Sequence, residues 1–238
     1  MSLAPTDYDF GVPANYAFAE KITCSNDEAR RMYVEAFGHM LNYNHEQAIA
    51  CFTKCTELDP NCAMAWWGIA YCLSSSYNWS AGLGPGYDAI SQAVSLKDHC
   101  SELEQDLIMA LSKRHTKEAR DNANPAALNM GNSPELNQAF ADAMAPLYEK
   151  YSGNLDVTAI YVEALMNLNP WTLWNKDAST GEITPVDDST LMLIKIMEDA
   201  FESSDEAKVH PALCHLYCHA LELSPFPERA LPAADVLR

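Results

Sequence analysis

Positive charge and glycine are both scarce in this chain of 238 residues. It has 15 Lys and Arg against 33 Asp and Glu, which gives a formal net charge of −18. A surface of that sign repels phosphate backbones and anionic lipid surfaces, so we expect no nucleic acid and no membrane among its partners. With 9 glycines and 48% hydrophobic residues, the composition favours an ordered, helix-rich fold over a disordered chain.

The sequence also lacks the patterns that export or anchor a protein. No apolar run approaches the ~18–20 residues of a membrane span, and Met1 to Tyr16 contains no basic or apolar stretch typical of a signal peptide. The eight cysteines include no C-x-x-C pair, which argues against a zinc ribbon. Cys51/Cys55 and Cys214/Cys218 are each four apart on expected helices, where bridging is disfavoured. We therefore predict reduced, small core cysteines in a cytoplasmic protein.

Helix signals recur along the chain, whereas strand signals do not. Ser25 with Glu28, and Ser101 with Glu104, have the spacing of a capping box, and Ser133 precedes a proline suited to a first helical position. We expect helices at about 25–40, 45–58, 61–75, 101–115, 133–151, 155–168, 189–203, 211–223 and 227–238. No segment alternates with period two over the length of a convincing strand, so the predicted fold class is all-α.

Three segments between these helices are predicted to be loops. Ser80 to Gly86 contains three glycines and a proline, and Thr116 to Asn132 is polar and rich in asparagine. Asn169 to Asp188 is long and carries Trp171 and Trp174. Two tryptophans in a long loop indicate a segment packed over something, either as a structural plug or as a lid over a pocket.

Residues 29–60 resemble a tetratricopeptide repeat (TPR). Met32, Ala36, Ala48, Phe52, Cys55 and Pro60 stand at that motif's large, small, small, aromatic, small and proline positions, and Met64, Trp67, Gly68 and Tyr71 begin a second unit. The resemblance implies about five antiparallel helix pairs stacked as a right-handed superhelical α-solenoid over 25–238, after an N-terminal extension at 1–24.

The whole chain also resembles a poorly characterised bacterial and fungal group of TPR-like proteins. The stretches that carry this resemblance are C-A-M-A-W-W-G-I-A (62–70), E-A-L-M-N-L-N-P-W (163–171) and H-P-A-L-C-H-L-Y-C-H-A-L-E-L-S-P-F-P-E-R-A-L (210–231). Members of the group look longer than this chain. The resemblance therefore implies an array that is incomplete at its C-terminal end, which a missing C-terminal half or a second polypeptide would complete.

Aligning the first helices of the expected pairs places charged or polar residues where TPR normally has apolar ones. Glu35, Glu163 and His219 share this register. An unpaired charge turned into a helix seam costs several kcal/mol, so each needs a partner. Glu163 and His219 would lie on adjacent helices and are expected to meet. Glu35 is expected to bond a tyrosine or His39.

The segment from His210 to Glu222 is the strongest candidate site. His215 and His219 are four apart and Glu222 is three further on, so all three share one helix face, with His210 at the helix start. Two interpretations remain open. One is a polar network that fixes helix register. The other is a site for Fe, Cu or Zn with His210, His215 and His219 as ligands and Glu163 or Glu222 as third ligand or general base.

Aromatic residues elsewhere have two interpretations as well. Trp66 and Trp67 are either core residues or the wall of a ligand pocket, which Tyr77 and Asn78 would extend and Trp171 and Trp174 would shield. We therefore expect an enzyme that uses a metal for an oxidative or hydrolytic reaction on a small molecule. The alternative is a non-catalytic TPR scaffold whose concave groove binds a peptide or protein partner.

Overall fold

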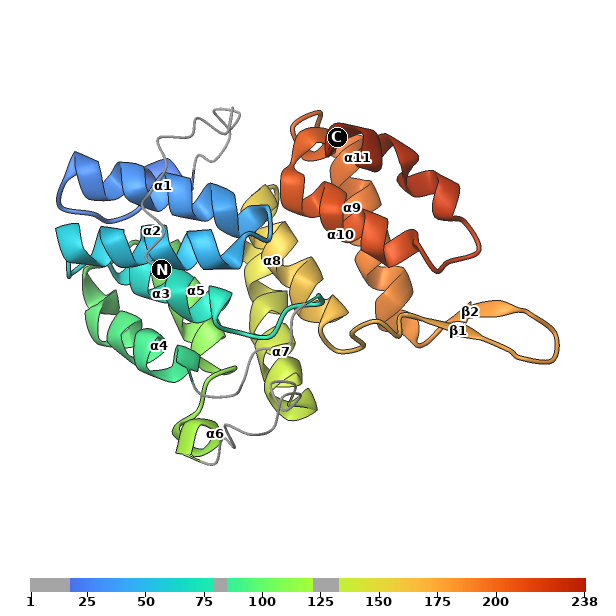
Figure 1. Cartoon of the computed structure of the whole chain (residues 1–238), viewed down its shortest axis with the longest axis horizontal. Coiled ribbons are helices and arrows are strands. Elements are labelled where there is room, and N and C mark those ends of the chain that lie inside the picture. Colours follow the sequence, from blue (N-terminus) through green and yellow to red (C-terminus); the bar gives the residue numbers. More distant parts are fainter. Residues whose placement is uncertain (1–17, 79–84, 122–132) are drawn as a thin grey trace. The chain divides into compact units, whose positions relative to one another are not determined.

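The computed structural model describes residues 18–78, 85–121 and 133–238, and this part of the chain is mainly helical (Figure 1). The all-α prediction is confirmed. The chain divides into two compact units, which are described separately. Unit 1 comprises Met1–Ser75 and Ser80–Ala143, and unit 2 comprises Ser76–Trp79 and Met144–Arg238. The predicted solenoid of five pairs, with its boundary at residue 25, stays a prediction.

Unit 1 is built of successive helices that pack on their neighbours in sequence. Helices α1 and α2 lie side by side, α2 packs on α3, α3 on α4 and α4 on α5 (Figure 1). The bounds of its elements are η1 Ala19–Lys21, α1 Asp27–Leu41, α2 His45–Leu58, α3 Ala63–Cys72, α4 Pro85–Leu96, η2 Lys97–His99, α5 Glu102–Ser112 and α6 Lys117–Asp121. Helix α7, Pro134–Lys150, begins in unit 1 and ends in unit 2.

Aromatic side chains fill the core between the first helices of unit 1. Tyr33 stacks on Phe37 with ring centroids 5.9 Å apart and meets Phe52 of α2 at 5.4 Å. Phe52 in turn lies against Gly68 of α3, where a Cβ atom added to the glycine would come within 2.4 Å of the ring. Trp67 is fully buried, and its indole N–H donates to the carbonyl of Leu107. Small residues thus let these helices approach closely while large ones occupy the space between them.

The predicted N-terminal caps can be compared with the observed starts of the helices. Ser101 and Glu104 form the predicted capping box, and Ser133 Oγ accepts from the amide of Leu136. The box predicted at Ser25 is wrong, because Asn26 is the N-cap of α1 and accepts from the amide of Ala29 over 2.8 Å. The amide of Ser25 instead donates to Asp59 over 2.6 Å, which anchors the segment before α1 to the end of α2.

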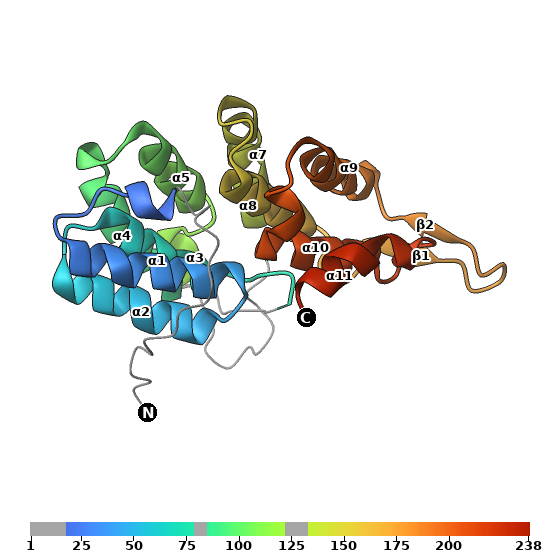
Figure 2. The ribbon, with the colours of Figure 1, turned by 90° about the horizontal axis from the view of Figure 1, so that it is seen from above.

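Unit 2 consists of short helices around α10. Helix α10 packs on α8, α9 and α11, and a small hairpin extends from the helices of this unit (Figure 2). The bounds of its elements are α8 Leu155–Met166, β1 Trp174–Lys176, β2 Ile183–Pro185, α9 Asp188–Ser203, η3 Ala207–Val209, α10 Pro211–Leu221, η4 Pro227–Ala230 and α11 Leu231–Val236.

Parts of the predicted loops form regular secondary structure. Within Asn169 to Asp188 the strands β1 and β2 pair antiparallel, with Trp174 opposite Pro185, so the expectation of no strand is wrong at this place. Three-residue strands are too short for a period-two pattern to reveal. Helix α6 occupies the start of Thr116 to Asn132. The remainder of that segment, and most of Ser80 to Gly86, lies outside the described residues.

Two further expectations concern the cysteines and membranes. All eight cysteines fall within the described residues, all are free thiols, and five of them are buried, in line with the predicted reduced state. Across 18–78, 85–121 and 133–238, none of the helices combines the length and apolar character needed to cross a bilayer.

Candidate histidine site in unit 2

Helix α10 carries the three predicted histidines, and its start is set by one of them. His210 is the N-cap, its Nδ1 accepts from the amide of Leu213 over 3.3 Å, and Pro211 follows at the first helical position. One and two turns further on, His215 and His219 project from the same face, with ring centroids 4.7 Å apart. The helix therefore brings two of the three imidazoles together through its own periodicity.

One nitrogen of each ring, Nε2 of His215 and Nε2 of His219, lies close to the same atom of Asn78. Nδ2 of Asn78 lies 3.3 Å from Nε2 of His215 and 2.7 Å from Nε2 of His219. The two hydrogens of the amide can serve both rings at once, one for each nitrogen. In this arrangement both Nε2 atoms accept from the amide.

Glu222 supports the second of these rings. It is the C-cap residue of α10, and its Oε1 lies 2.7 Å from Nδ1 of His219. The Nδ1–H of His219 donates to this carboxylate, which fixes the ring's tautomer and directs Nε2 toward Asn78. Glu222 therefore contacts the histidine pair through Nδ1 of His219, on the side of the ring opposite Asn78.

Two aromatic rings flank the histidine pair. Tyr77 stacks on Trp171 with centroids 5.3 Å apart, and both rings lie within 5.7 Å of the imidazole of His219. Trp171 is 52% exposed and has a left-handed backbone, with φ of 61°. A bulky residue in that conformation is strained, and such strain concentrates at functional sites. The predicted tryptophan loop therefore presents an aromatic surface beside the imidazoles.

Burial shifts the pKa values of two members of the cluster. It lowers the pKa of His215 to about 4, with a smaller contribution from the charge of His219. It also raises the pKa of Tyr77 to about 12, and the carboxylate of Glu222 adds to that effect. His215 is consequently neutral at pH 7, with a lone pair available for a ligand, and Tyr77 keeps its phenol proton.

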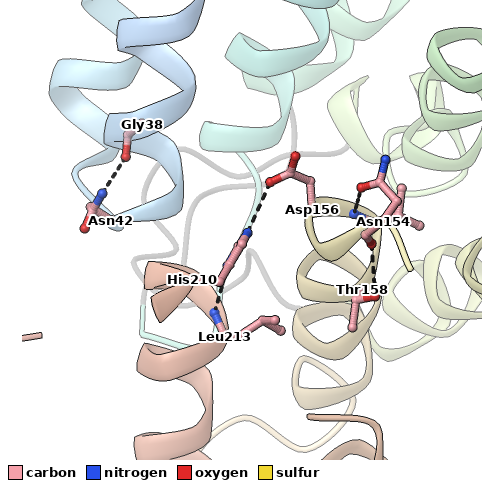
Figure 3. Close-up of polar contacts among 8 residues, drawn as sticks. Gly38, Asn42, Asn154, Asp156, Thr158, His210 and Leu213 are labelled. Atoms are coloured by element: carbon pink, nitrogen blue, oxygen red, sulfur yellow. Dashed lines mark hydrogen bonds and ion pairs between the residues drawn. The ribbon is translucent and has the colours of Figure 1, made fainter. Parts of the chain in front are cut away.

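His210 has a different environment from the other two histidines. Its Nε2–H donates to Oδ1 of Asp156, in the first turn of α8, over 3.2 Å, and both side chains are buried (Figure 3). The carboxylate and the amide of Leu213 engage one ring nitrogen each. This contact joins the starts of α8 and α10, so His210 holds the two helices together.

The other predicted site residues occupy three settings. Trp174 lies in β1 and donates its indole N–H to the carbonyl of Ala220 over 2.7 Å. Glu163 is buried on α8, which packs against α10. Trp66 and Trp67 belong to unit 1, where their indoles donate to the carbonyls of Pro60 and Leu107.

Two features of the structure were predicted only in part. Asn78 was expected to line a pocket together with Tyr77, but its contacts with His215 and His219 involve residues more than 130 positions away, which no local pattern reveals. The second feature is a group in unit 1. Within the part of the chain that the structure describes, one set of three side chains has the spacing of a metal site, namely Glu35, His39 and Cys51. Their ligand atoms all lie within 4.8 Å of one another.

Comparison of the chain with protein-family models, with curated proteins and with solved structures gave no match.

Proposed function

We propose that unit 2 binds a divalent transition-metal ion through Nε2 of His215 and Nε2 of His219. The observation that supports this most directly is the convergence of both nitrogens on the single atom Nδ2 of Asn78, at 3.3 and 2.7 Å. Two lone pairs aimed at one point are the requirement for chelation. An amide that donates to both occupies the position where an ion would accept from both.

The surroundings of the pair are those of a metal ligand set. Histidines that bind metals usually donate their second ring N–H to a carboxylate, and His219 does so to Glu222. Glu222 is thereby assigned to orientation of His219 rather than to direct ligation. Two imidazoles suit Zn, Cu or Fe, and the donors alone do not select among them.

A metal held by two protein nitrogens keeps coordination positions open for water or a substrate. The ring of Trp171, half-exposed and stacked on Tyr77, lies beside these positions and offers an apolar face to a small organic molecule. The proposed function is therefore metal-dependent chemistry, oxidative or hydrolytic, on a small molecule that has an aromatic or apolar part.

A second candidate, binding of a peptide or protein partner, draws on a separate feature of unit 2. A pocket of about 660 Å³ opens between α9, α10 and α11. Phe201, Val209 and Val236 give it apolar walls, and Glu198 and Arg229, which pair with each other, give it polar ones. A protein that is metal-free but folded would favour this scaffold function.

Metal content separates the two candidates. Protein purified without a polyhistidine tag would be analysed for Zn, Fe and Cu, then titrated with Zn²⁺ by calorimetry. We expect the His215→Ala/His219→Ala double variant to bind one equivalent less than the parent. His99→Ala is the matched control, since His99 is an exposed histidine of unit 1 and its loss should leave the stoichiometry unchanged. Equal metal binding by the parent and the double variant, with circular dichroism showing both folded, would reject the proposal.

A further inference from the structure

A second group of donor atoms lies between α1 and α2 of unit 1. Glu35 and His39 are four apart on α1 and so project from one face of it, and Cys51 faces them from α2. The three ligand atoms lie within 4.8 Å of one another. The short turn from α1 to α2, and the packing of those two helices, create this group without any contribution from unit 2.

The spacing is close to that of a bound ion. In tetrahedral Zn²⁺ sites the metal–sulfur and metal–oxygen distances place sulfur and oxygen about 3.6 Å apart. Sγ of Cys51 lies 3.9 Å from Oε1 of Glu35. This distance is a few tenths of an ångström longer than in an occupied site, and the other two pairs of ligand atoms lie within 4.8 Å.

Burial and charge favour a divalent cation at this place. His39 is 3% exposed and Cys51 is fully buried, while Glu35 is partly exposed and leaves a path to the solvent. Binding of a divalent ion would release the thiol proton of Cys51 to water. The carboxylate, the thiolate and the ion then sum to zero charge.

Neighbouring polar side chains orient the donors. Nδ2 of Asn44 lies 3.3 Å from Nδ1 of His39, and Nε2 of Gln47 lies 3.7 Å from Sγ of Cys51. Asn44 is the N-cap residue of α2, yet its side chain makes no capping bond and engages the imidazole instead. A metal-binding histidine donates its second ring N–H to an acceptor, and the amide oxygen of Asn44 takes that place when the side-chain amide is turned by 180°.

We propose that Glu35, His39 and Cys51 form a binding site for a divalent transition-metal ion of the zinc class, distinct from the histidine pair of unit 2. Three protein ligands of oxygen, nitrogen and sulfur leave the fourth tetrahedral position for water. The site ties α1 to α2 through the ion and adds a metal link to the first helix hairpin of the chain.

Cobalt(II) is the probe that tests this site, because a thiolate ligand gives a charge-transfer absorption band that carboxylate and imidazole ligands do not. The titration would use the His215→Ala/His219→Ala double variant, so that the site in unit 2 cannot contribute. We expect one equivalent of Co²⁺ to bind with a thiolate band, and Zn²⁺ to displace it. Failure of this result leaves the proposal for unit 2 untouched, because that site is absent from the protein tested.

Three variants in the same background identify the ligands. Cys51→Ser should abolish the thiolate band, and His39→Gln should weaken Co²⁺ binding about tenfold or more. Cys55→Ser is the matched control, since Cys55 is a buried thiol one turn further along α2, and it should keep the band. If Cys55→Ser does not fold, Cys214→Ser in unit 2 serves as the control in its place. Absence of a thiolate band in the parent background, or its persistence in Cys51→Ser, would overturn the proposal.

Discussion

The indole N–H of Trp174 donates to the main-chain carbonyl of Ala220 over 2.7 Å. Ala220 lies in the last turn of α10, where helix carbonyls have no partner within the helix. The hairpin thus caps the end of the helix that carries His215 and His219, through a residue 46 positions earlier in the sequence.

Replacing Trp174 with Phe should test this cap. The variant keeps an aromatic ring in β1 but leaves the carbonyl of Ala220 without its donor, which should lower the free energy of unfolding by about 1–2 kcal/mol. Urea denaturation followed by circular dichroism would measure it. The control is Trp171→Phe, where the replaced side chain is 52% exposed and a change within about 0.5 kcal/mol is expected. Equal effects of the two substitutions would contradict the assigned role.

Local sequence signals predicted most of the helices, because caps and periodicity act within a few residues. The bounds predicted for the second helix, 45 to 58, match α2, and the capping box of Ser101 is present. The box at Ser25 failed because Asp59, a residue distant in the sequence, binds the amide of Ser25. Where a long-range contact competes with a local one, the sequence pattern alone does not show which prevails.

The close contact between Gly68 and Phe52 leads to a second stability prediction. A Cβ at position 68 would lie 2.4 to 2.6 Å from three atoms of the Phe52 ring, so Gly68→Ala forces the ring or the helices α2 and α3 to move. Overpacking of this kind should destabilise the protein by about 1–3 kcal/mol, although alanine is the better helix former. Thermal and urea unfolding would measure the loss.

A double variant provides the control for that contact. Phe52→Leu alone should cost stability because it removes a buried ring, but it also opens space beside position 68. Gly68→Ala combined with Phe52→Leu should therefore be less destabilised than the sum of the two single variants. Strict additivity would show that the clash lies elsewhere.

The two candidate sites show which of their residues helix spacing in the sequence can predict and which it cannot. The shared face of His215 and His219, and the proximity of Glu35 to His39, follow from residues four apart on one helix. The third members, Asn78 and Cys51, come from other elements. Their places depend on how a chain segment or a second helix packs, and no local pattern carries that information.

The lowered pKa of His115 leads to a prediction of how the free energy of unfolding depends on pH. Burial, with a smaller effect from the positive charge of Arg114, lowers its pKa to about 4, and its Nε2 lies 2.8 Å from Oγ of Ser74. The unfolded chain takes up a proton near pH 6.5, whereas the folded protein does not until about pH 4. Stability from this group is therefore complete above pH 6.5 and is lost as the pH falls toward 4.

The corresponding measurement compares urea unfolding at pH 7.5 and pH 5.0. The two pKa values imply that His115 alone accounts for a loss of about 2 kcal/mol between these conditions. His115→Gln, which cannot take up a proton, should be less stable than the parent at pH 7.5 but should lose about 2 kcal/mol less on acidification. Parallel losses in both proteins would show that His115 is protonated equally in the folded and unfolded states.

Asn78 offers a test of the unit 2 site that gains rather than removes function. In the structure its amide stands between Nε2 of His215 and Nε2 of His219, where the proposed ion would lie. Asn78→Asp supplies a carboxylate which, once its side chain withdraws from that point, can act as the third ligand of a two-histidine site. Zn²⁺ affinity measured by calorimetry should then rise about tenfold or more, equal to about 1.4 kcal/mol. Asn78→Ala removes the amide without adding a ligand and should change the affinity much less. If Asn78→Asp binds Zn²⁺ no more tightly than Asn78→Ala, the two imidazoles do not share an ion at that point.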